Sequence, residues 1–219
     1  MPLSATISTI ISRSKSIEIC DSLHDAQNAS TEEELIEAGL PLAVYSYQTG
    51  IVDDALLGSD FTEATLNTYN VYTTGTYTVA DPSAEVYIMK NAVVNLSLSG
   101  TTNVKINVMG GGNLNLIAGG TSYATVKLYD NAILSATIND NAMINLESKE
   151  NSVSTIVMNN SSIFNLIANS KSGCTYTGNN TSYGLANLYQ NATLNYILND
   201  TALLDFKLFQ QGSAINSLT

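Results

Sequence analysis

The chain has little of what enzymes, metalloproteins and nucleic-acid-binding proteins use. Its 219 residues include no tryptophan, one histidine, two cysteines and three prolines, and only 12% of them are charged. One histidine and two distant cysteines give no cluster with the ligand spacing of a zinc site. Eight basic residues against nineteen acidic ones leave a net charge of −11. This balance argues against direct binding of nucleic acid, because phosphate groups require patches of lysine and arginine.

The sequence also lacks the marks of export and membrane insertion. Residues 1–12 are apolar only in part and have no basic stretch before them, so they make a poor signal peptide. No run approaches the roughly eighteen apolar residues of a membrane-spanning helix. We therefore expect no membrane insertion. Cys20 and Cys174 lie far apart in the sequence, and we interpret both as free thiols.

What the sequence does have is a ten-residue repeat, which runs from about Glu85 onward in register with the residue numbers. Positions ending in 4, 6 and 8 are mostly apolar, those ending in 2 are small, and those ending in 0 and 1 are polar or glycine. The column ending in 4 includes Val94, Leu114, Leu134, Ile144, Phe164, Leu194 and Leu204. A short period without insertions predicts a repeat architecture.

Within each repeat, apolar and polar residues alternate with a period of two, as in a β-strand with one buried face. Val104, Ile106 and Val108 are expected to point one way, and Lys105 and Asn107 the other. We therefore predict a mainly β fold. Its core is a β-solenoid of ten-residue strand–turn repeats, in which each coil forms hydrogen bonds with the next.

Each strand is expected to end at a polar corner, followed by a small inward residue. Asparagine and glycine tolerate the left-handed backbone conformation that such a corner needs. The corner asparagines are Asn91, Asn131, Asn141, Asn151 and Asn191. Small residues such as Ala92 and Ala132 come next and suit a tight interior position.

A second column of asparagines lies within the expected strands. Its members are Asn95, Asn115, Asn145, Asn165 and Asn195. Stacked on one another they would form ladders of side-chain amides. The alternative interpretation is that they are simply outward polar residues of the strands.

The number of repeats in one coil is open from the sequence. Residues 121–134 are similar to residues 181–194, and this spacing of sixty fits coils of twenty or of thirty residues. Twenty residues would give a flat, two-sided solenoid of roughly six turns, and thirty a three-sided prism of roughly four. A third possibility is that several chains wind together. We favour twenty.

Residues 1–84 lack the repeat and are predicted to be an acidic region with short helices. Residues 16–27 place apolar side chains on one face of a helix. Ser30–Glu33 fits a capping box that opens a second helix, which stops at Gly39. Residues 42–47 are predicted to be a strand, and residues 62–80 extended chain leading into the solenoid.

Charge is unevenly divided between the two predicted regions. Residues 1–84 contain twelve acidic and two basic residues, a net of −10, whereas residues 85–219 contain seven and six, a net of −1. We expect the acidic region to cover the first coil, because a bare strand edge invites pairing with another chain. We also expect it to dock onto a basic partner.

Few residues are candidates for catalysis. Asp130, Asp140 and Asp200 share one column, and carboxylates can serve a glycosidase or bind calcium. Aspartate is also favoured at corners, and we interpret these residues in that way. His24 lies on the first predicted helix among acidic residues, as a surface residue would. We expect no enzyme, no catalytic or metal site and no cofactor.

The corner segments Tyr129–Ile133 (YDNAI) and Asn139–Met143 (NDNAM) show a family resemblance. They are similar to the "DNA-x-V" β-solenoid repeats in proteins of Bacteroides-type gut bacteria and their phages. The resemblance covers roughly residues 85–218, is strongest at the corner Asn-Ala pairs, and fades at Gly111–Gly112 and in residues 165–184. Residues 33–39 are also similar to the openings of small phage structural proteins. The resemblance implies a virion component of a crAss-like tailed phage and transfers no functional residue.

These observations together predict a non-enzymatic structural protein located in a virion. It would be a head or tail fibre, a fibre adaptor or a decoration protein. It would form homo-oligomers and bind other virion or scaffold proteins through its N-terminal region. One alternative is a bacterial scaffold, in the cytoplasm or at the cell surface, that polymerises end to end and is similar to bactofilins. Another is a carbohydrate-binding module that takes a surface glycan.

Overall fold

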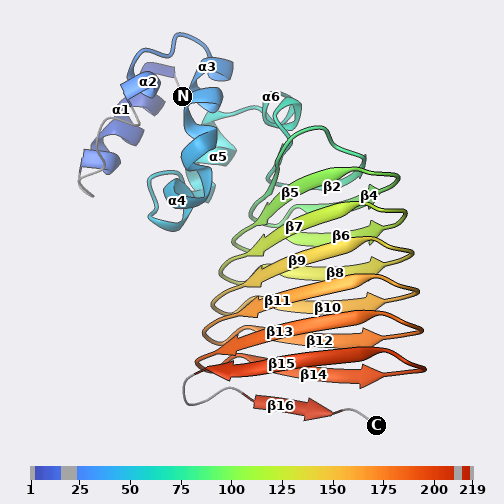
Figure 1. Ribbon diagram of the computed structural model, residues 1–219. Helices are drawn as coiled ribbons and strands as arrows, with labels where there is room; N and C mark the ends of the chain where they lie inside the picture. Colours follow the sequence, from blue (N-terminus) through green and yellow to red (C-terminus); the bar gives the residue numbers. More distant parts are fainter. Residues whose placement is uncertain (1–2, 16–23, 210–213, 218–219) are drawn as a thin grey trace. The chain divides into compact units, whose positions relative to one another are not determined.

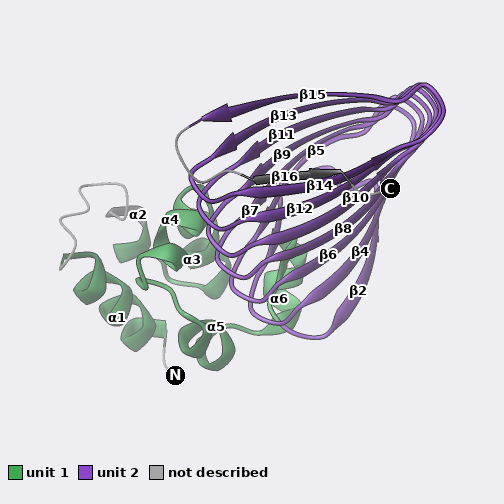
Figure 2. Ribbon diagram, turned by 90° about the horizontal axis from the view of Figure 1, so that it is seen from below, with its two compact units in different colours: residues 1–73 green, residues 74–219 purple. Residues whose placement is uncertain are grey.

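The computed structural model describes residues 3–15, 24–209 and 214–217. The chain divides into two compact units, Met1–Thr73 and Thr74–Thr219, which Figure 2 shows in different colours. The first solenoid strand begins at Thr76. The boundary between the units therefore lies before Glu85, where the sequence repeat becomes recognisable.

The first unit is built from short helices. Its elements are α1 (Leu3–Lys15), α2 (His24–Gln27), α3 (Glu32–Gly39), the 3-10 helix η2 (Leu40–Leu42), α4 (Ala43–Gln48), α5 (Asp54–Asp60), α6 (Glu63–Thr68) and the two-residue strand β1 (Val71–Tyr72). Apolar side chains from α1, α2, α3, α5 and the loop before α5 form its core. The buried members are Ile10, Ala26, Leu35, Ile51 and Leu56. Helices this short depend on such packing, because isolated helices of this length are marginal in water.

The capping box of α3 lies one residue later than predicted. Residue Thr31, not Ser30, is the N-cap, and its hydroxyl accepts a 3.2 Å hydrogen bond from the Glu34 N–H. Glu34 in turn accepts a 2.7 Å bond from the Ser30 N–H. The helix ends at Gly39, as predicted. Of the helix predicted over residues 16–27, residues 16–23 lie outside the described part of the chain and residues 24–27 form α2.

Two segments predicted to be extended are helical, so those predictions were wrong. Residues 43–48 form α4 instead of a strand, and residues 63–68 form α6. The Thr62 hydroxyl accepts a 3.1 Å bond from the Thr65 N–H and so provides the N-cap of α6. Period alone does not separate a short apolar run of helix from one of strand. Only residues 71–72 and 76–80 of the second segment are strand.

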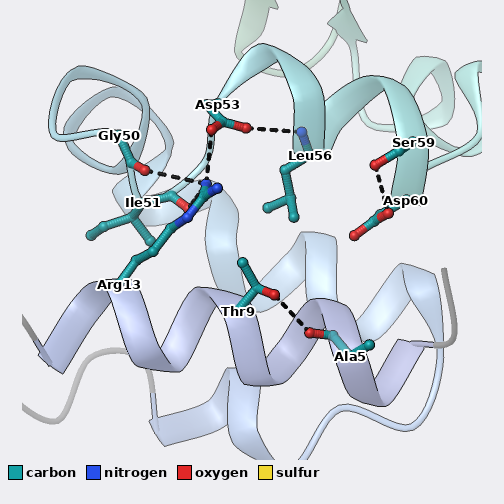
Figure 3. A network of polar contacts seen from close by, with 9 residues as sticks. All are labelled: Ala5, Thr9, Arg13, Gly50, Ile51, Asp53, Leu56, Ser59 and Asp60. Atoms are coloured by element: carbon teal, nitrogen blue, oxygen red, sulfur yellow. Dashed lines mark hydrogen bonds and ion pairs between the residues drawn. The ribbon is translucent and has the colours of Figure 1, made fainter.

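Arg13 joins α1 to the start of α5 (Figure 3). Its guanidinium donates to the carbonyl oxygens of Gly50 (3.3 Å) and Ile51 (3.1 Å), and one of its nitrogens lies 3.1 Å from a carboxylate oxygen of Asp53. The other oxygen of Asp53 accepts a 2.9 Å bond from the Leu56 N–H and caps α5. One carboxylate thus stabilises a helix end and an inter-helix contact together.

The second unit is a parallel β-solenoid of about seven turns, which confirms the predicted fold class. Figure 1 shows its strands stacked one above another in two facing sheets. The even-numbered sheet consists of β2 (Thr76–Ala80), β4 (Val93–Leu98), β6 (Asn113–Ala118), β8 (Ile133–Ile138), β10 (Val153–Met158), β12 (Gly173–Gly178), β14 (Thr193–Leu198) and β16 (Ala214–Ser217). The odd-numbered sheet of this unit consists of β3 (Val86–Ile88), β5 (Asn103–Val108), β7 (Tyr123–Leu128), β9 (Met143–Ser148), β11 (Ile163–Ala168), β13 (Tyr183–Tyr189) and β15 (Leu203–Phe209).

One coil contains twenty residues. Ile163 on β11 pairs with Tyr183 on β13, and Val153 on β10 pairs with Gly173 on β12. Each ten-residue repeat is therefore half a coil, and consecutive repeats lie on opposite sheets. This register settles the choice between twenty and thirty residues in favour of the smaller coil.

The interior is filled by the apolar columns that the sequence shows. Residues ending in 4, 6 and 8 are buried in nearly every coil. Phe164 and Tyr176 stack across the interior with ring centroids 5.4 Å apart. Gly178 and Gly184 lie beside Tyr176 and leave room for its ring. A Cβ on Gly178 would lie 2.8 Å from the Tyr176 hydroxyl oxygen, and a Cβ on Gly184 would lie 3.2 Å from the same atom. Two small residues thus compensate for one large one.

The left-handed residue of each corner is the one before the predicted asparagine. The non-glycine residues ending in 0 from Lys90 to Asp200 have φ between +54° and +60°. The corner asparagines Asn91, Asn131, Asn141, Asn151 and Asn191 follow this residue and are exposed. The small residues after them are buried, as predicted, and Ala92, Ala132, Ala142 and Ala192 are fully so. At Gly112 a Cβ would lie 2.8 Å from the Ile88 carbonyl oxygen, so glycine is needed there.

Candidate interaction surface

The predicted asparagine column forms two separate ladders on the outside of the solenoid. Asn115 donates a 2.9 Å bond to Asn95 on the even-numbered sheet, and Asn165 donates a 2.8 Å bond to Asn145 on the odd-numbered sheet. Asn195 lies on β14, four strands along the even-numbered sheet from Asn115, the nearest member of the predicted column on that sheet. Both interpretations of the column therefore apply to these two pairs, because their side chains point outward and also form hydrogen bonds along the stack.

A longer asparagine ladder follows β8, β10, β12 and β14, and the sequence interpretation missed it. Asn159 donates to Asn139 (2.9 Å), Asn179 to Asn159 (2.9 Å) and Asn199 to Asn179 (2.7 Å). The signal is visible only at a spacing of twenty. The intervening positions ending in 9 hold lysine, asparagine and tyrosine, so a ten-residue alignment hides the column.

Side chains at the corners cap the backbone of the preceding coil. The Gly120 N–H donates a 2.9 Å hydrogen bond to the Asp140 carboxylate, and the Asn180 N–H donates a 3.0 Å hydrogen bond to the Asp200 carboxylate. At the opposite corner the Asp130 N–H donates a 2.6 Å hydrogen bond to the Glu150 carboxylate. Each acceptor lies twenty residues after its donor. These carboxylates satisfy N–H groups that the left-handed turn leaves without a strand partner.

The three aspartates considered for catalysis do not converge. Asp140 and Asp200 lie at corners that follow even-numbered strands, whereas Asp130 lies at a corner that follows β7, on the other side of the coil. In the described ranges, no group of three or more histidine, cysteine, aspartate or glutamate residues could hold a metal ion. The aspartates act as acceptors for the backbone, which is a structural use.

Acidic and basic groups meet at the corner after β9. Lys149 lies 2.8 Å and Lys127 lies 3.5 Å from Glu147, and the Lys149 ammonium sits 5.4 Å from the Tyr129 ring centroid. Burial opposes ionisation of Glu147, but the hydrogen bonds and charges of Lys149 and Lys127 lower its pKa overall. Burial, reinforced by Asp130, raises the pKa of Glu150. Burial also raises the pKa of Tyr129 to about 12.

The two outer faces of the solenoid differ in charge. Outward strand positions from β4 to β14 of the even-numbered sheet carry no charged side chain, whereas those of the odd-numbered sheet include Lys105, Lys127 and Glu147. The uncharged face bears an open hollow of about 450 Å³. Its lining includes Thr78, Asn95, Asn115, Ile117, Ser135 and Thr137. Ile117, which is 59% exposed, gives this face an apolar contact.

Strand β15 has exposed apolar residues in columns that are buried elsewhere. Phe206 pairs with Ala186 and Leu208 with Leu188, two fully buried residues of β13. Phe206 is nevertheless 43% and Leu208 52% exposed. No strand follows β15 in its sheet within the described part of the chain. Its outer edge is therefore open to another strand.

The remaining predicted features have simple placements. Cys174 is a free thiol inside the solenoid, where burial raises its pKa to about 12. His24 begins α2. Among the helices that the structure describes, none has the length and apolar content of a membrane span.

Comparisons with protein-family models, curated proteins and solved structures gave no match.

Proposed function

We propose that the chain is a structural component of a tailed-phage virion, a fibre, fibre adaptor or decoration protein. Its solenoid serves as a rod and its helical unit as the attachment. The resemblance of its corner segments to "DNA-x-V" repeats supports this role. The fold supports it too, because β-solenoids are typically structural.

One observation carries the proposal. Among the described residues, the polar side chains outside the solenoid form hydrogen bonds along the stack and do not converge on a reacting centre. The ladder from Asn139 to Asn199 runs over four coils, and the corner carboxylates Asp140, Glu150 and Asp200 accept backbone N–H groups. Such a surface rigidifies a rod, since every coil is fixed to the next by side chains as well as by the sheet.

The helical unit is the attachment site in this proposal because it holds most of the net charge. Residues 1–73 contain eleven acidic and two basic residues, a net of −9, and residues 74–219 contain eight and six, a net of −2. Helix α3 presents Glu33 and Glu37 as exposed carboxylates. A basic partner surface would be attracted to this unit, and the attraction would weaken as salt is added.

The test is incorporation into particles. Gradient-purified virions of the phage that encodes the chain should contain it in stoichiometric amounts by mass spectrometry. A phage that carries the double substitution E33K/E37K should lose it from the particle, while K90E/K171E, which reverses two charges of the solenoid, should not. Absence of the wild-type chain from virions would reject the virion role. Normal incorporation of E33K/E37K would reject α3 as the attachment.

The hollow on the even-numbered sheet favours a second candidate, binding of a neutral glycan. Hydroxyl and amide groups of Thr78, Asn95, Asn115 and Ser135 line it, with no charged residue among its lining. Such groups match the hydrogen-bonding groups of neutral sugars. Isothermal titration with neutral oligosaccharides tests this role, and N115A should abolish any binding that occurs there. Binding that survives N115A would place the sugar elsewhere.

A further inference from the structure

The sequence of β15 is self-complementary when it is read in both directions from Phe206. Leu204 and Leu208 are equivalent neighbours of the centre, and Asp205 and Lys207 are opposite charges at equal distances from it. In an antiparallel pair of two such strands centred on Phe206, Asp205 of each copy faces Lys207 of the other. Opposite charges directly across an antiparallel pair are stabilising, whereas like charges are destabilising.

The backbone of β15 is arranged for this pairing. The N–H of Leu203 donates 3.0 Å to the Ser182 carbonyl and so points toward the preceding coil. Because N–H groups alternate along a strand, those of Leu204, Phe206 and Leu208 point to the open edge. Phe206 would therefore form the hydrogen-bonded pair at the centre. Asp205 and Lys207 would occupy the flanking non-hydrogen-bonded pairs, where side chains approach most closely.

The side chains of β15 are available for such a contact. Leu203, which is 63% exposed, and the partly exposed Phe206 and Leu208 would lose solvent contact against β15 of a second copy. Lys207 makes no ion pair with any residue in the described ranges. One oxygen of Asp205 accepts a 2.8 Å bond from the Tyr183 hydroxyl, and its other oxygen remains for the lysine of a partner.

We propose that two copies of the chain pair through the open edges of β15, antiparallel and tail to tail, with a two-fold axis at Phe206. The pairing continues the odd-numbered sheet from one solenoid into the other and covers the open edge of β15, which otherwise invites uncontrolled association. The register follows from charge, since a shift by one residue along either strand would face like charges or separate the opposite ones.

The first test is the oligomeric state of the full chain by sedimentation equilibrium. The wild type should be a dimer, and K207D should weaken dimerisation at least tenfold because two pairs of aspartates would then face each other. The control K171D makes the same change at an exposed corner and should dimerise like the wild type. A monomeric wild type, or K207D dimerising like K171D, would overturn the proposal.

The second test uses mixing and is specific for the two-fold geometry. D205K places lysines against lysines, and K207D places aspartates against aspartates, so each variant alone should dimerise at least tenfold more weakly than the wild type. An equimolar mixture should form a heterodimer, because both facing pairs are then opposite in charge. The double variant D205K/K207D should dimerise alone. A mixture that stays monomeric although circular dichroism shows both variants folded would exclude this register. If D205K does not fold, K207D against K171D decides the question.

Discussion

Asn165 donates a 2.8 Å hydrogen bond to Asn145, the residue paired with it in the preceding coil. Twenty residues separate them, and residue Thr155, midway between, lies on the opposite sheet. The ten-residue period of the sequence therefore describes half a coil. Contacts along the stack obey a period twice as long, and it is this longer period that sets which side chains meet.

The ladder at positions ending in 9 should contribute measurably to stability. Asn159 donates to Asn139 and accepts from Asn179, so N159A removes two hydrogen bonds and should lower the free energy of unfolding by about 1–3 kcal/mol. Urea unfolding measures this change. The matched control is N169A, at the same position of the opposite corner, where no side-chain hydrogen bond lies within the described part of the chain. Equal losses for both variants would contradict the ladder's role.

How much of the fold and of the outer surface could be predicted from the sequence depends on how far apart in the chain the interacting residues lie. The alternation of Val104, Lys105 and Ile106 is local, so strands and inward faces follow from the sequence alone. The asparagine ladder needs the coil length as well. Rows that carry Asn139 and Asn159 alternate with rows that carry Tyr129 and Lys149, and this alternation was the available sign of a twenty-residue coil.

The helical unit was harder to predict because it has no repeat. α4 is only six residues long (AVYSYQ), too short for its period to be recognised. The N-cap of α3 differs by one residue from the prediction, since Ser30 and Thr31 are both good caps and Glu34 can reach back to either. The open edge of β15 was also beyond local reading, because exposure of Phe206 depends on which strand comes next in space.

The glycine beside Tyr176 should not tolerate a methyl group. In G178A the new Cβ would lie 2.8 Å from the Tyr176 hydroxyl oxygen and 3.1 Å from the Ala202 Cβ, so we expect a loss of about 1–3 kcal/mol. Y176F removes the hydroxyl, which lies near that of Ser182 without a hydrogen bond of normal geometry to any described residue.

Y176F should therefore change stability by less than about 1 kcal/mol. The double variant G178A/Y176F should be more stable than the sum of the single effects predicts, by about 1 kcal/mol. Strict additivity in urea unfolding would show that the methyl group and the hydroxyl do not meet.

Glu150 and Glu147 should contribute to the pH dependence of stability with opposite signs. Burial and Asp130 raise the pKa of Glu150, so the folded state binds its proton more tightly than the unfolded state does. Ionised Glu150 then costs stability above its folded pKa, and the cost disappears as the pH falls. E150Q should be more stable than the wild type at pH 7, by less than about 1 kcal/mol because solvent screens this corner.

The opposite sign is expected for Glu147, whose pKa is lowered overall by Lys149 and Lys127 against the effect of burial. Its contribution is present above the unfolded pKa and lost as the pH falls, so E147Q should destabilise at pH 7 and converge with the wild type in acid. Thermal unfolding from pH 3 to 8 measures both differences. A destabilised E150Q at pH 7 would contradict the assignment.

The thiol of Cys174 should react only when the solenoid opens. It is 2% exposed, and burial raises its pKa to about 12, so almost no thiolate exists at pH 8. In a C20S variant, labelling by a thiol-specific disulfide reagent should be at least 1000-fold slower in the native protein than in urea (about 4 kcal/mol of protection). The rate should rise with denaturant along the unfolding curve. Rapid stoichiometric labelling in buffer would show that the interior at β12 is not closed.

The constant twenty-residue coil turns chain length into physical length. Strand spacing in a sheet is about 4.8 Å, so each added coil lengthens the solenoid by that step and leaves the amide ladders in phase. An insertion of ten residues moves everything after it to the other sheet, and Asn159 would then meet a tyrosine or lysine column. Duplication of whole coils in the gene would therefore lengthen the solenoid in equal steps and leave the residues at both of its ends unchanged.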